Sequence, residues 1–205
     1  MKKGLLIVLS GPSGAGKGTV YNAVIQKMPQ LKKSISVTTR SPRVGETEGV
    51  HYYFKSVEEY DRMKSDGEFL ETARVYDNYY GTPKAPVFEM LEKGDDVFFE
   101  IDIAGAKQIK AKYPECVSVF IMPPSFEILE RRLRGRGTES EESLAKRLGS
   151  ARSELAEYGC FDYIVFNDEA EKATQRVMDI ISAERSAISR NEEKIKSMLE
   201  IKTEI

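Results

Sequence analysis

The first residues that could do chemistry are glycines and a lysine in the pattern GxxxxGK at residues 11–17. Glycine lets the backbone turn its N–H groups inward, so such a loop forms a nest for oxyanions. A helix that begins at the loop adds partial positive charge, and Lys17 can reach terminal phosphates as a point charge. The pattern predicts a site for a nucleoside triphosphate. The residues expected to bind it are Gly11, Pro12, Ser13, Gly14, Ala15, Gly16, Lys17, Gly18 and Thr19.

The residue after the lysine departs from the general pattern. Gly18 stands where Ser or Thr usually supplies a hydroxyl to Mg²⁺. We expect Mg²⁺ to accompany the triphosphate as its cofactor and to be held mostly through water. Thr19 is one candidate ligand. Glu100 is a second, because a carboxylate at a strand end suits a hard cation.

The elements that must position these residues can be read from the apolar pattern. Continuous apolar runs at 5–9, 97–103, 117–122 and 163–166 predict buried strands. Helical segments are expected at 17–28, 86–93, 104–113, 125–134 and 141–158, and from about 169 onward. This alternation predicts an α/β fold with a parallel sheet flanked by helices, with the glycine loop directly after the first strand.

Two stretches interrupt the alternation and suggest inserted parts. Residues 34–83 are rich in aromatic residues, Thr and Arg, and predict an antiparallel lobe inserted in the core. Residues 134–157 are highly charged and predict a mobile lid. We therefore expect one domain over 4–184, with its core at 4–33 and 84–184, and a helical tail at 185–205.

Composition excludes several classes of function. Among 205 residues, 31 basic side chains face 33 acidic ones, so no basic excess exists to neutralise a nucleic-acid backbone. The two cysteines form no CxxC pair and indicate reduced thiols. No apolar stretch approaches the about 18 residues that a membrane helix requires. We expect a soluble, cytoplasmic protein without nucleic-acid or membrane partners.

Several motifs occur together in the order of one known family. They are SISVTTRSPRVGETEGVHYYF at 34–54, NYYGT at 78–82, EIDIAG at 100–105, GRGTESEES at 135–143 and IVFND at 164–168. With the glycine loop, this series resembles guanylate kinases over roughly residues 4–184. The resemblance implies a P-loop kinase that transfers the γ-phosphate of ATP to GMP in purine nucleotide metabolism, with residues 34–83 binding GMP.

The resemblance also implies roles for individual residues on the acceptor side. Arg40 and Arg43 match arginines that clamp the GMP phosphate, and guanidinium forks suit that bidentate contact. Tyr52 and Tyr80 match tyrosines whose hydroxyls contact the same phosphate. The residues that match the guanine-reading set are Ser36, Glu71, Thr82 and Asp102.

On the donor side, Arg136 and Arg147 match arginines that contact the transferring phosphates, and Asn167 matches a contact to adenosine. The implied reaction is an in-line transfer in which an anionic GMP oxygen attacks the γ-phosphorus, so no base is needed. The catalytic set is then Lys17, Arg40, Arg136 and Arg147.

Two other readings remain open at this stage. One is a related small-molecule kinase with a different monophosphate acceptor. The other is a guanylate-kinase-like module that binds phosphopeptides and has lost catalysis. The oligomeric state and the use of dGMP are also open.

Overall fold

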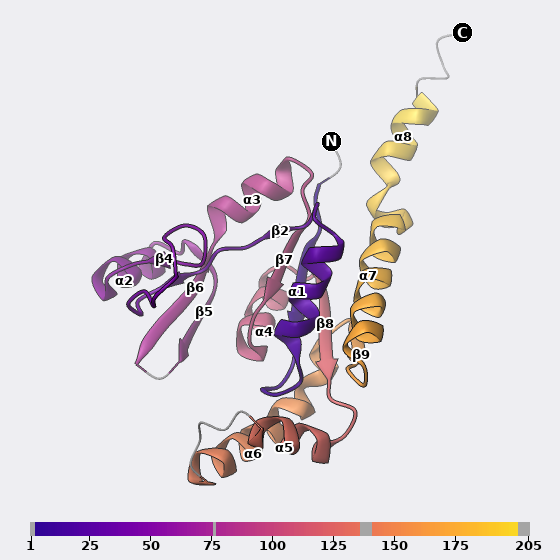
Figure 1. Ribbon diagram of the computed structural model, residues 1–205. Helices are drawn as coiled ribbons and strands as arrows, with labels where there is room; N and C mark the ends of the chain where they lie inside the picture. The colour runs from indigo at the N-terminus through magenta and orange to yellow at the C-terminus, as the bar shows by residue number, and fades with distance from the viewer. Residues whose placement is uncertain (1–2, 76, 136–140, 201–205) are drawn as a thin grey trace.

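The computed structural model describes residues 3–75, 77–135 and 141–200 and centres on a five-stranded sheet (Figure 1). The strand order is β2-β7-β1-β8-β9, and every neighbouring pair is parallel. The predicted parallel sheet is thus confirmed. Its strands are β1 (Leu6–Ser10), β2 (Lys32–Lys33), β7 (Val97–Glu100), β8 (Val117–Met122) and β9 (Tyr163–Phe166).

Helices cover both faces of this sheet, which explains its continuous apolar strands. Ile7 and Leu9 of β1 belong to the apolar cluster on the side of α1 and α7, whereas Leu6 and Val8 belong to the cluster on the side of α3 and α4. All five residues of β1 are buried. The helices are α1 (Lys17–Lys27), α7 (Ala170–Ser186), α3 (Lys84–Glu92) and α4 (Ile103–Lys112).

Two details of the core differ from the sequence expectation. Strand β7 ends at Glu100 rather than at residue 103, because Asp102 caps α4 by accepting a hydrogen bond from the Gly105 N–H. Strand β2 was not predicted, because it consists of two exposed lysines and carries no apolar signal.

The inserted lobe forms a second sheet in the order β4-β3-β6-β5. It is antiparallel as expected, except that β3 and β4 pair in parallel. Residues 39–52 form a long connection between these two strands instead of a hairpin, so β4 runs in the same direction as β3. The elements of the lobe are β3 (Val37–Thr38), β4 (Tyr53–Phe54), α2 (Val57–Ser65), β5 (Phe69–Val75) and β6 (Asn78–Pro83).

Helices α5 (Phe126–Arg134) and α6 (Glu141–Ala156) lie together below the sheet in Figure 1, close to the loop that precedes α1. Ser125 caps α5, as its side chain accepts from the Ile128 N–H at 3.2 Å. Leu129 and Leu133 of α5 form an apolar cluster with Ala151 of α6. The described part of the charged segment at 134–157 is therefore a helix with an apolar face, followed by the short helix η1 (Glu157–Cys160).

The tail continues through η2 (Ile188–Arg190) into α8 (Glu192–Glu200), which projects beyond the sheet in Figure 1. Arg185, in the last turn of α7, pairs through Nε with the buried carboxylate of Asp96. The other Asp96 oxygen accepts from the Leu5 N–H at 2.9 Å. The start of the tail is thereby attached to the core. Within the described residues, no helix is both long and apolar enough to cross a membrane.

Candidate active site

The glycine loop at residues 11–17, the expected phosphate loop, follows β1 and leads into α1, as the sequence predicted. Gly11, Gly14 and Gly16 have φ values of 145°, 84° and 89°, a region that favours glycine. A Cβ at Gly11 would overlap the Ile121 carbonyl oxygen. The turn that presents backbone N–H groups therefore requires these glycines, and α1 begins directly after it at Lys17.

The ammonium group of Lys17 lies over the loop. Its Nζ donates to the Gly11 carbonyl oxygen at 2.6 Å and to the Pro12 carbonyl oxygen at 3.1 Å. These bonds hold the positive charge at the mouth of the loop, where the terminal phosphates of a bound triphosphate would lie.

Two side chains, those of Asn167 and Arg132, donate hydrogen bonds to the backbone of the loop. Asn167, which follows β9 and is 3% exposed, donates from Nδ2 to the Ala15 carbonyl oxygen at 2.7 Å. Arg132 of α5 donates to the Asn167 carbonyl oxygen at 3.0 Å and to the Ala15 carbonyl oxygen at 3.4 Å. In this structure Asn167 thus contacts the phosphate loop itself, while its expected contact with adenosine stays a prediction.

A further link joins the loop to α6. The Glu154 carboxylate accepts from the Ser13 N–H at 3.1 Å. Next to it, a Cβ at Gly14 would lie 2.9 Å from Leu129 Cδ1 and 3.0 Å from Leu133 Cδ2, so the loop packs directly on α5. The pair of helices α5 and α6 is therefore fastened to the phosphate loop.

One carboxylate lies where a loop-bound cation could use it. A Cβ at Gly18 would lie 3.4 Å from Glu100 Oε1, so the missing side chain leaves the Glu100 carboxylate room beside the start of α1. Desolvation raises the pKa of the Glu100 carboxyl, and the charge of Lys17 opposes that shift. Thr19 is exposed in the first turn of α1. Among the residues described, no three His, Cys, Asp or Glu side chains form a metal-binding group by themselves.

On the lobe, Arg40 converges with two tyrosines. The Arg40 guanidinium lies 5.6 Å from the ring centroid of Tyr52, and the Tyr52 and Tyr80 centroids are 6.0 Å apart. Glu46 accepts from Arg40 Nη2 through both oxygens, at 2.8 and 3.0 Å, and also from the Arg43 N–H at 2.7 Å. The Arg40 hydrogen bond lowers the pKa of Glu46. Glu46 thus fixes an arginine fork that can bind a phosphate.

The four residues of the expected guanine-reading set lie together. Thr82 Oγ1 donates to Glu71 Oε1 at 2.7 Å, and Ser36 Oγ lies 3.5 Å from Thr82 Oγ1. Burial raises the pKa of the Glu71 carboxyl; the Thr82 hydrogen bond opposes this shift, and the charge of Asp102 adds to it. Glu71 is only 4% exposed, whereas Asp102 is open to solvent at the start of α4. Two acidic acceptors therefore face one small region between the lobe and the core.

Two predicted residues cannot be placed. Arg136 lies outside the described residues, and the Arg147 side chain does as well, although α6 includes its position. The structure also places at the site four residues that the sequence did not single out, namely Glu46, Gly105, Gln108 and Glu154. Of these, Glu46 and Gly105 stand inside the quoted motifs.

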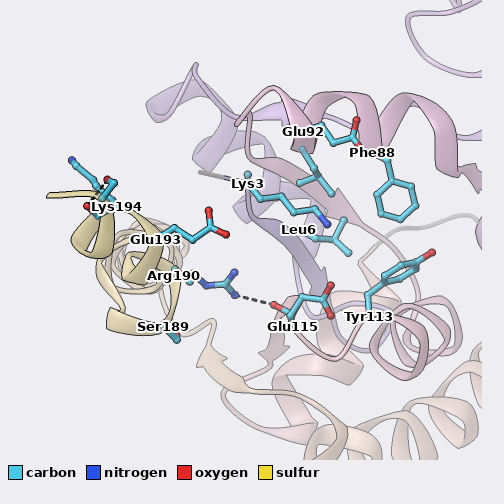
Figure 2. A pocket seen from close by; sticks show the side chains of 13 residues that line it. Lys3, Leu6, Phe88, Glu92, Tyr113, Glu115, Ser189, Arg190, Glu193 and Lys194 are labelled. Carbon is cyan, nitrogen blue, oxygen red and sulfur yellow. Dashed lines mark hydrogen bonds between the residues drawn. The ribbon is translucent and has the colours of Figure 1, made fainter. Parts of the chain in front are cut away.

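A separate cavity of about 960 Å³ lies between the body of the protein and the tail (Figure 2). Lys3, Phe88 and Tyr113 line one side, and Arg190 and Glu193 line the other. This cavity adjoins the beginning of β1, whereas the phosphate loop follows its end. It therefore does not belong to the candidate active site.

Comparison with known proteins agrees with this geometry. The family model for guanylate kinase matches residues 3–184. The guanylate kinase of Caldanaerobacter subterraneus subsp. tengcongensis is 53% identical over 192 residues, which cover 94% of this chain and 93% of that protein. The guanylate kinase of Clostridioides difficile is 49% identical over 190 residues, covering 93% of each chain.

A solved structure of a guanylate kinase is also similar to this protein in three dimensions. The crystal structure of guanylate kinase from Anaplasma phagocytophilum superposes with a TM-score of 0.74 at 35% identity, covering 93% of this chain and 90% of that one. The residues 3–184 that the family model matches include the central sheet, the lobe and the helices around the phosphate loop. This chain belongs to the guanylate kinase family.

Proposed function

We propose that the protein catalyses transfer of the γ-phosphate of ATP to GMP, giving ADP and GDP. One observation carries this proposal most directly. The buried Glu71 carboxylate and the open Asp102 carboxylate face the same small region. Strand β6 connects this region to the Arg40 fork, because Thr82 bonds to Glu71 and Tyr80 lies beside Tyr52 and Arg40. In a single bound nucleoside monophosphate, the base could contact the two carboxylates while the phosphate contacts Arg40.

Guanine suits this pair of acids for a chemical reason. Its N1–H and exocyclic amine are adjacent donors, so each can pair with a carboxylate acceptor. Adenine has an acceptor at N1 and would leave one buried acid without a partner. Sites that depend on such pairing discriminate by about 10⁴-fold or more. Ser36 and Thr82, which lie beside Glu71, can offer hydroxyl groups to the guanine oxygen.

The acceptor phosphate would bind at Arg40, with Arg43, Tyr52 and Tyr80. The fork of Arg40 is already oriented by Glu46, and guanidinium groups bind phosphate through paired hydrogen bonds. Held in this way, the GMP phosphate directs one of its oxygens toward the γ-phosphorus of the donor.

The donor triphosphate would lie in the glycine loop with Lys17 at its terminal phosphates. Mg²⁺ bound to ATP neutralises phosphate charge, and the Glu100 carboxylate fits it as a direct or water-mediated partner, with Thr19 as a further candidate. Arg136 and Arg147 would add positive charge from the lid at 134–157, and Asn167 would support the adenosine side.

Catalysis then consists of positioning and charge stabilisation. The attacking phosphate oxygen is already anionic at neutral pH, so the transfer needs no general base and forms no covalent enzyme intermediate. Lys17 and the arginines stabilise the charge that develops on the transferred group. Such a reaction belongs to purine nucleotide metabolism in the cytoplasm.

The direct test follows the label of γ-labelled ATP in the presence of GMP. The proposal predicts that the label appears in GDP, at a rate far above its release as inorganic phosphate. Folded protein that binds GMP but leaves the label in ATP would instead support a binding module without catalysis.

A further inference from the structure

The free edge of β5 is covered by helix α4 next to Glu71. β5 is an edge strand of the lobe sheet, so one side of its backbone has no strand partner. Gln108 of α4 fills this side, because its Oε1 accepts from the Thr72 N–H at 3.1 Å and its Nε2 donates to the Thr72 carbonyl oxygen at 2.9 Å. One amide side chain thus pairs with a backbone residue as a strand would.

Lys112, one turn further along α4, extends the same contact. Its Nζ donates to the Leu70 carbonyl oxygen at 3.1 Å. The residues immediately before and after Glu71 are therefore both held by α4. Because α4 belongs to the core and β5 to the lobe, these bonds fix Glu71 relative to the core.

Gly105 supplies the space that this arrangement needs. It lies buried in the first turn of α4, where a Cβ would be 2.9 Å from Glu71 Oε2 and 3.3 Å from Asp102 Oδ1. Its N–H also donates to Asp102 Oδ1 at 2.7 Å. Helix propensity does not favour glycine over alanine, so the two carboxylates, and not helix stability, explain the glycine at this position.

We propose that α4 sets the selectivity for the base, with Gly105 and Gln108 as positioning residues that act through Glu71. Gln108 fixes the backbone beside Glu71, and Gly105 lets the Glu71 carboxylate come beside Asp102. Neither residue needs to touch the substrate. This inference rests on the proposed function, because it assumes that Glu71 and Asp102 accept hydrogen bonds from guanine.

The first experiment compares Gly105→Ala with Gly149→Ala. Gly149 is a helical glycine of α6 with open space around its Cβ position, so it is a matched control. The added methyl at 105 displaces the Glu71 carboxylate. We expect the KM for GMP to rise by about tenfold, as loss of one substrate hydrogen bond implies. The KM for ATP stays near wild type, and the preference for GMP over AMP falls.

The second experiment removes the amide clamp. Gln108→Leu keeps the size of the side chain but loses both bonds to Thr72, whereas Gln175→Leu removes an amide from the exposed face of α7. Only Gln108→Leu should raise the KM for GMP. Its effect on kcat at saturating GMP should be smaller, because the groups around the phosphates are unchanged.

A double-mutant cycle separates positioning from a general loss of structure. If Gly105 acts through Glu71, then Gly105→Ala should add little to the KM for GMP in a Glu71→Ala background. Equal effects of Gly105→Ala with and without Glu71, or GMP kinetics of both α4 variants like their controls, would overturn the inference. Wild-type protein that does not phosphorylate GMP at all would instead contradict the proposed function itself.

Discussion

The proposed recognition of guanine by Glu71 and the stability of the fold favour opposite charge states of its carboxyl group. Burial raises its pKa, which means that the folded protein holds this proton more tightly than the unfolded chain does. Ionisation of Glu71 therefore destabilises the fold as the pH rises from the ordinary glutamate range through the raised value. Hydrogen bonds from guanine would favour the ionised form. Bound substrate would therefore offset the free-energy cost of burying the Glu71 charge in the empty site.

Glu71→Gln tests this account of the empty site. The amide keeps an acceptor for Thr82 and removes the charge, so the variant should be more stable than wild type above the pKa of Glu71. The difference should shrink toward pH 4, where both side chains are neutral. Urea unfolding of both proteins at pH 4 and pH 8 measures it. A difference that is the same at both pH values would contradict the role of the charge.

At the residue scale, the resemblance to a family, and not the chemistry of single residues, singled out the expected guanine-reading set. Ser36, Thr82 and Asp102 stand in separate quoted motifs, Glu71 stands outside them, and the structure brings the four side chains together. Gln108 and Glu154 could not be found in this way. Both bind backbone groups, which every residue presents, so their partners leave no mark on the sequence.

Among the elements, α6 is joined to the phosphate loop by direct contacts. Glu154 bonds to the Ser13 N–H, and the apolar cluster of α5 and α6 packs on Gly14. A movement of α6 would therefore change the position of the loop, and this would couple the proposed lid at 134–157 to the proposed binding of ATP.

Glu154→Ala should loosen the loop without unfolding the helix. The loss of one net hydrogen bond predicts a rise of about 2- to 10-fold in the KM for ATP, with the KM for GMP unchanged. Glu154→Gln retains an acceptor and should restore the wild-type value. Ser150→Ala, on the exposed part of the same helix, serves as the control in these steady-state measurements. If the Gln and Ala variants behaved alike, hydrogen bonding to Ser13 would not be the cause.

The main elements of the core followed from apolar periodicity, while the short elements did not. β1, β8 and β9 lie where continuous apolar runs predicted them. The two-residue strands β3 and β4 are too short to show a period, so the parallel pairing between them has no sequence signal. That pairing depends on the path of the connecting residues 39–52.

At the scale of the whole molecule, the C-terminal tail is attached to the core by a buried carboxylate. Asp96 is 5% exposed and joins the Leu5 N–H to Arg185. It thereby connects the residue before β1, the turn before β7 and the end of α7. The family match ends at residue 184, so this attachment lies at the boundary between the shared domain and the tail.

Asp96→Ala should lower the free energy of unfolding by about 1–3 kcal/mol, because it leaves a buried N–H without an acceptor. Asp179→Ala, which removes an exposed carboxylate from α7, should have little effect. Chemical denaturation measures both. Equal stability of the Asp96 variant and wild type would show that water replaces the carboxylate without cost.

The protein should also close around its two substrates, because the transferred group must be shielded from water. The lobe and the helices α5 and α6 lie on either side of the phosphate loop in Figure 1. Small-angle scattering should give a smaller radius of gyration with GMP and a non-hydrolysable ATP analogue together than without nucleotides. The same radius in both states would contradict closure.

Selective phosphorylation of GMP can be measured by ADP formation from ATP and Mg²⁺ with GMP, AMP, dTMP and UMP supplied in parallel. We expect a kcat/KM for GMP about 10⁴-fold or more above that for AMP, and little turnover with the pyrimidines. Rapid turnover of a different monophosphate would keep the kinase but contradict the guanine-reading role of Glu71 and Asp102. Folded protein that is inactive with all four acceptors would contradict the proposed reaction.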